Sequence, residues 1–119
     1  MTLIPESELR EPSGMNVTDR ELIRAFMQGA IYCWVKNRPE EPFAVRDLVG
    51  GMNTNWSQTP LQVLYDRHID SGKTEDDAFD AAAKDIGWIV KTLLSEDRRT
   101  FEVDNSGFVN TYHMIGDNV

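Results

Sequence analysis

The sequence is poor in cysteine and histidine, the residues that stabilise many small domains through disulfide bonds or bound zinc. One of its 119 residues is cysteine and two are histidine. Cys33 therefore has no intramolecular disulfide partner, which is typical of proteins from reducing compartments. The positions of Cys33, His68 and His113 match no zinc-ligand spacing. We expect a cytoplasmic protein without a metal site.

Long apolar runs are also missing. No stretch approaches the ~18 apolar residues of a membrane-spanning helix. The first residues lack the basic start and apolar block of a signal peptide. We therefore expect no membrane partner. Hydrophobic residues still make up 40% of the chain, enough for a globular core, and the length suits a single domain.

Basic residues are few. Twelve Lys and Arg side chains against twenty Asp and Glu give a formal net charge of −8. Such a field repels nucleic acid and anionic membranes at long range and favours solubility or basic partners. A local basic patch can still bind DNA, so nucleic acid stays open as a partner.

Catalytic constellations are missing as well. Cys33 falls on the apolar face of a predicted helix, where burial would prevent it from acting as a thiolate nucleophile. Carboxylate pairs are too numerous in an acidic chain to indicate acid–base catalysis. The sequence predicts a protein that is not an enzyme and that uses no cofactor.

Helix signals begin after an N-terminal arm, residues 1–17, which we expect to be extended. Thr18 and Glu21 fit a capping box. The helix that they open runs to about Lys36 and stops before Pro39, because the residue before proline disfavours helix. Its predicted apolar face consists of Leu22, Ile23, Phe26, Met27, Ala30, Cys33 and Trp34.

Ile31 and Val35 fall outside that face, so the first helix is apolar almost all round. A helix of this kind is either central to its domain or shared with a second subunit. Ile31 and Val35 are therefore the candidate dimer interface, and the protein is a candidate homodimer.

The remaining elements give an α+β fold that is mostly helical, with three long helices, one short helix and a C-terminal β-hairpin. We expect one domain over residues 18–116. In order, the expected elements are a strand at 43–45, a helical turn at 46–49, a helix from the Thr59 cap and Pro60 to Ser71, a helix from 75 to about 98, and a hairpin around the turn at 104–107.

This order of elements resembles the winged-helix variant of helix-turn-helix, from about Thr18 to Ile115. The segment Phe43-Ala-Val-Arg-Asp-Leu-Val49 looks like the strand-to-second-helix step of that superfamily. One long helix more than the family pattern lies before the hairpin. If the 75–95 helix were the recognition helix, its three leading acids would face phosphate oxygens. The resemblance implies either DNA reading or protein docking.

Trp88 is the candidate partner-binding residue. It lies on the side of its helix opposite the apolar stripe, with Lys84 and Lys91 beside it at i−4 and i+3. An outward aromatic between two cations can anchor a protein partner or stack on a base. The alternative is that Trp88 packs under the N-terminal arm, the hairpin or a dimer mate.

Four residues are candidates for nucleic-acid contact. Arg98 and Arg99 stand just before the hairpin, where they either contact phosphates or balance the helix dipole. Gln58 and Gln62 stand near the start of the Pro60 helix.

Three functions follow from these features. The leading hypothesis is an adaptor or regulator that binds a protein partner; a partner that handles nucleic acid is one option within it. The second is a DNA-binding transcriptional regulator that uses the Pro60 helix and the hairpin wing. The third is an acidic decoy that occupies a nucleic-acid site on another protein.

Overall fold

The computed structural model describes residues 2–3, 15–50 and 55–117. It is an α+β fold, mostly helical with a C-terminal antiparallel hairpin, which confirms the predicted class. The elements are β1 (Thr2–Leu3), α1 (Val17–Asn37), α2 (Val45–Val49), α3 (Gln62–Asp70), α4 (Glu75–Glu96), β2 (Arg99–Asp104) and β3 (Thr111–Asp117).

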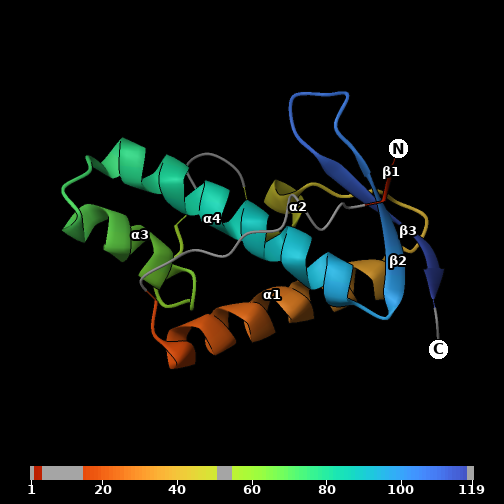
Figure 1. Cartoon of the computed structure of the whole chain (residues 1–119), viewed down its shortest axis with the longest axis horizontal. Coiled ribbons are helices and arrows are strands. Elements are labelled where there is room, and N and C mark those ends of the chain that lie inside the picture. The colour runs from red at the N-terminus through yellow and green to blue at the C-terminus, as the bar shows by residue number, and fades with distance from the viewer. Residues whose placement is uncertain (1, 4–14, 51–54, 118–119) are drawn as a thin grey trace.

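The long helix α4 runs through the middle of the molecule, and the other long helix, α1, lies along its lower side in the view (Figure 1). α3 packs beside the first half of α4, and the sheet lies at the other end, with the hairpin loop rising from it. The sheet has the antiparallel order β1-β2-β3. Within the predicted N-terminal arm, Thr2 and Leu3 pair with β2 as an edge strand, and residues 4–14 lie outside the described part of the chain.

The buried face of α1 differs from the predicted one. Ile31 is 0% exposed and Val35 is 6% exposed, because both pack into the core of their own chain. The prediction that they form a dimer interface is therefore wrong. Leu22, at 53% exposure, and Phe26, at 40%, lie outside the core although the sequence placed them in it. Cys33 is also exposed, against its predicted burial.

Two helix starts also differ from prediction. Asn16, not Thr18, caps α1, because its Oδ1 accepts the N–H of Asp19 at 2.8 Å. An N-cap side chain satisfies one of the backbone donors that a helix start leaves unpaired. α3 begins at Gln62, and the predicted Thr59 cap belongs to a turn that precedes it.

Phe43 holds the start of α2 against the hairpin. Of the predicted strand at 43–45, only Phe43 pairs, donating its N–H to the Tyr112 carbonyl at 2.8 Å and accepting the Tyr112 N–H at 2.7 Å. Both side chains are 1% exposed, and their ring centroids lie 5.9 Å apart. The Phe43 ring also contacts Trp34 and Phe101. This aromatic cluster fixes α2 beside β3.

Asp97 fixes the junction between α4 and β2. Its Oδ1 accepts the Arg99 N–H at 2.9 Å and Nε–H at 2.8 Å, and its Oδ2 accepts Arg99 Nη2–H at 2.9 Å. Oδ2 also accepts Nε2–H of Gln28, on α1, at 3.0 Å. The Arg99 guanidinium lies 4.1 Å from the centroid of the Tyr32 ring. One carboxylate thus joins α1, α4 and the hairpin.

The pKa of Asp97 reflects these bonds. Burial by itself raises the pKa, because it disfavours the charged carboxylate. The hydrogen bonds from Arg99 and Gln28, together with the positive charge of Arg99, outweigh burial and hold the pKa below its ordinary value. Asp97 therefore stabilises the fold in its ionised form.

Ile31→Asp tests the burial of α1. A carboxylate at this position has no place in an apolar core, so we expect the free energy of unfolding to fall by at least about 3 kcal/mol. Leu22→Asp, on the exposed side of the same helix, should stay within about 0.5 kcal/mol of wild type. Urea unfolding measures both. A folded, stable Ile31→Asp monomer would contradict the assignment of this face to the core.

Asp97→Asn tests the junction through pH. Because the folded pKa is lowered, the stabilisation is present above the unfolded pKa of about 4 and is lost as the pH falls through the folded value. We expect the variant to be about 2 kcal/mol less stable than wild type at pH 7, and the difference to shrink at pH 3. Urea unfolding at both pH values measures this, with the exposed Asp70→Asn as control. A pH-independent difference would refute the ionic role.

Candidate functional site

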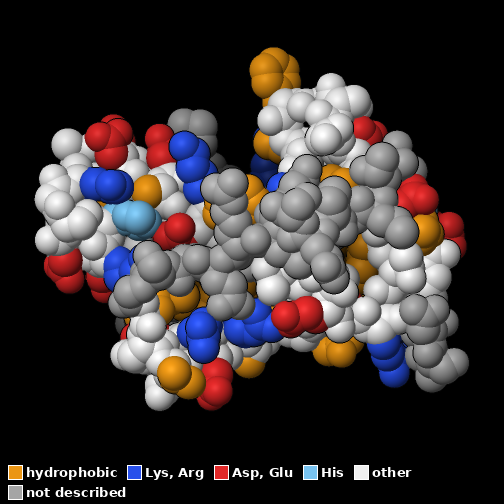
Figure 2. Space-filling view, in the orientation of Figure 1, with side chains coloured by type: hydrophobic (Ala, Val, Ile, Leu, Met, Phe, Trp, Pro, Cys, Tyr) orange, Lys and Arg blue, Asp and Glu red, His pale blue; other side chains and the backbone are white. Residues whose placement is uncertain are grey.

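A groove separates α4 from the loop of the β2–β3 hairpin. It has a volume of about 400 Å³. The molecular surface is hollowed between the hairpin and the α3–α4 end, at the top of the view (Figure 2). Three segments line it: Ala44, Val45 and Arg46 from the start of α2, Lys84, Gly87, Trp88 and Lys91 from α4, and Val109, Asn110 and Tyr112 from the hairpin.

The α4 side of the groove contains the whole predicted partner-binding set. Lys84, Gly87, Trp88 and Lys91 are spaced at i, i+3, i+4 and i+7, so they form one stripe along the helix. The core stripe of α4 faces the other way, toward α1 and the sheet. Trp88 is half-buried, and Lys91 Nζ lies 4.7 Å from its ring centroid, a cation–π contact. Trp88 thus lines an open groove next to the hairpin.

The groove has an apolar floor and a cationic rim. Ala44 and Tyr112 are its buried members, at 3% and 1% exposure. Arg46 and Lys84 are exposed. With Lys91 they place three positive charges around the groove, and the described residues that line it include no Asp or Glu. A locally positive site has therefore formed in a chain whose net charge is −8.

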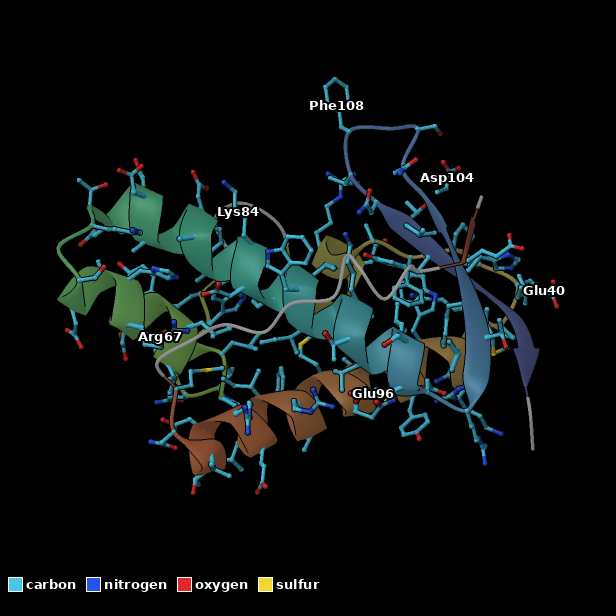
Figure 3. All side chains as sticks on the ribbon, viewed as in Figure 1. Glu40, Arg67, Lys84, Glu96, Asp104 and Phe108 are labelled. Carbon is cyan, nitrogen blue, oxygen red and sulfur yellow. The ribbon has the colours of Figure 1, made fainter. Side chains whose placement is uncertain are left out.

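Phe108 stands beside the groove and was missed by the sequence analysis. It points away from the hairpin loop (Figure 3) and is 110% exposed. Its neighbour Val109 lines the groove. An aromatic ring in this position loses contact with water only when another molecule covers it. The turn signal that ends at Gly107 could have identified Phe108, because it places the next residue in a loop.

Arg46 was missed for a different reason. It belongs to α2, far from α4 in the sequence, and reaches the groove only because Phe43 holds α2 against β3. No local pattern links Arg46 to Trp88.

The four candidates for nucleic-acid contact do not gather on one surface. Arg99 is 7% exposed and paired with Asp97, so the prediction that it contacts phosphate is wrong. Arg98 is exposed at the junction with β2, whereas Gln58 and Gln62 stand at the start of α3. α3 and the sheet lie toward opposite ends of the molecule (Figure 1).

His68 links two helices. Its Nε2 lies 2.8 Å from Asp85 Oδ2, which ties α3 to α4. In the part of the chain that the structure describes, no three His, Cys, Asp or Glu side chains come together to hold a metal. Across the same ranges, none of the helices combines the length and apolar character needed to cross a bilayer.

Comparison with known proteins finds no relative. No protein-family model matches the chain, and neither a curated protein nor a solved structure matches it. The resemblance to winged-helix domains is not tested by these comparisons and stays a prediction.

Trp88→Ala and Trp56→Ala form a matched pair that tests whether Trp88 lies outside the core. Trp56 is 6% exposed and stacks on Phe79 with centroids 4.8 Å apart. We expect Trp56→Ala to lower the free energy of unfolding by about 3–5 kcal/mol, and Trp88→Ala by less than about 1.5 kcal/mol. Urea unfolding measures the two values. Equal losses would make Trp88 a core residue.

Proposed function

We propose that the protein is a non-enzymatic binding module, an adaptor or regulator, that holds a protein partner in the groove between α4 and the hairpin. The observation that carries the proposal is the meeting of Trp88 with Arg46, Lys84 and Lys91 around an apolar floor.

The composition of the groove supports a protein partner. Tryptophan and arginine are enriched among the residues that dominate binding energy at protein interfaces. Such interfaces have an apolar centre and a polar rim. The groove has the same arrangement, with the buried Ala44 and Tyr112 at its centre and the exposed Arg46 and Lys84 at its rim. Phe108 adds an exposed aromatic on the hairpin loop, next to the lining residue Val109.

The two alternatives have less support. A DNA-binding regulator would need its basic and amide side chains on one surface, but Arg99 is buried and Arg98 is separated from Gln62 by much of the molecule. The net charge of −8 also opposes phosphate binding outside the groove. We find no observation in the described part of the chain that favours the acidic decoy.

The cellular location and the oligomeric state of the protein stay predictions. The single cysteine favours a reducing, cytoplasmic location, and an exposed Cys33 thiol is compatible with it. A partner that itself handles nucleic acid, and self-association as a homodimer, are likewise untested.

Gly87→Gln tests the groove by filling it. A Cβ at Gly87 would meet no heavy atom within 4 Å, and the residue lines the groove. Gln is a better helix former than Gly, so the variant should be about 0.5 kcal/mol more stable than wild type. We expect it to bind the partner at least about tenfold more weakly, a cost of ~1.4 kcal/mol.

The measurement is affinity capture from nuclease-treated extract of the source cell, followed by calorimetric titration of the captured protein. Gly29→Gln is the control, because Gly29 is exposed on α1 and a Cβ there also meets no heavy atom within 4 Å. It should bind as wild type does. If Gly87→Gln also binds as wild type does, the partner does not occupy the groove and the proposal fails.

A further inference from the structure

We infer that the occupant of the groove is an acidic linear segment of the protein partner, in which one large apolar side chain is flanked by Asp or Glu. This inference rests on the proposed function and specifies the chemistry of the partner.

The apolar side chain is required by the floor of the groove. The apolar residues that line the groove there are Ala44, Val45, Val109 and Tyr112. Apolar side chains form no hydrogen bonds with water. Covering these side chains with an apolar group of the ligand therefore lowers the free energy. Gly87 has no side chain, which lets a ligand approach the backbone of α4 closely.

The flanking acids are required by the rim. Arg46 projects from α2 and Lys84 from α4, and Figure 3 shows Lys84 on the side of α4 that faces the hairpin loop. Lys91 lies over the Trp88 ring, where the cation–π contact holds it. The described lining residues include no carboxylate beside Arg46 and Lys84. A ligand that is apolar throughout would offer no counter-charge to these two exposed cations, whereas Asp and Glu beside the anchor pair with them.

The charge of the whole protein adds selectivity. Outside the groove the excess of acid is larger than the overall value of −8, because three of the twelve cations stand at this one site. An acidic segment is therefore attracted to the groove and repelled by the rest of the surface. A basic segment would meet the opposite pattern and bind elsewhere.

A single-stranded nucleic acid fits the groove less well than an acidic peptide. Base stacking requires open aromatic faces. Inside the groove the protein's own Lys91 lies 4.7 Å from the Trp88 ring centroid, and the exposed Phe108 ring points away from the hairpin loop and does not line the groove. Ala44, Val45 and Val109 are aliphatic and offer no stacking surface. Phosphates beyond the groove would also meet the acidic surface.

The probes are short fluorescent peptides titrated against the full chain. The first has Asp, Glu and Ser around one central Phe. In the second Lys replaces the acids, in the third Ala replaces the Phe, and a single-stranded oligonucleotide is the fourth probe. We expect the first to bind at least about tenfold more tightly than the others, and its affinity to fall as salt is raised.

The variants locate the binding. R46E/K84E reverses two exposed charges at the rim, and K73E together with K36E makes the same change in net charge on α1 and the α3–α4 turn. Thermal unfolding should show all variants folded, since each site is exposed. We expect R46E/K84E to lose at least about tenfold in affinity for the acidic peptide and K36E/K73E to lose less than about twofold.

Equal binding of the acidic and basic peptides, tighter binding of the oligonucleotide, or equal losses in the two double variants would overturn the inference. Should Gly87→Gln still release the cellular partner in that case, the proposed function would stand and only its acidic ligand would be wrong. Should Gly87→Gln affect neither the cellular partner nor the peptide, both would fail.

Discussion

The groove exists because the carboxylate of Asp97 holds the hairpin at one position beyond the end of α4. Asp97 and Arg98 alone connect the two elements, and the bonds from Arg99 and Gln28 to Asp97 join this short turn to β2 and α1. Phe43 and Tyr112 then place α2 against the far side of the same hairpin. Groups that are buried and fully hydrogen-bonded make such a junction rigid.

In the complex that we propose, charge and apolar surface would have separate roles. The cations of α2 and α4 would attract an acidic partner over distances of a Debye length and orient it, which mainly raises the association rate. Trp88 and the apolar floor would then determine how slowly the partner leaves. Because the chain outside the groove is acidic, the groove is where an acidic ligand would meet the least repulsion.

The sequence predicted a residue's position correctly where a local pattern determines that position, and wrongly where tertiary packing determines it. The position of Trp88 outside the core could be predicted, because it is an aromatic residue on the side of α4 opposite a clean apolar stripe. The core face of α1, including Ile31, was predicted wrongly. This helix is apolar on almost every side, so the spacing of its apolar residues does not indicate which side is buried. Arg99 was misplaced because only the turn at Asp97 directs it inward while Arg98 stays exposed. Arg46 reaches the groove through tertiary packing that no local spacing records.

Site-specific photo-cross-linking in the source cell tests the central claim most directly. A photoreactive residue in place of Asn110 lies in the groove and leaves its cations intact, and one in place of Lys73 lies in the exposed turn before α4. The account predicts one discrete protein cross-linked from position 110 and absent from position 73, with its cross-linked peptide rich in Asp and Glu. Identical products from both positions, or none from position 110, would contradict it.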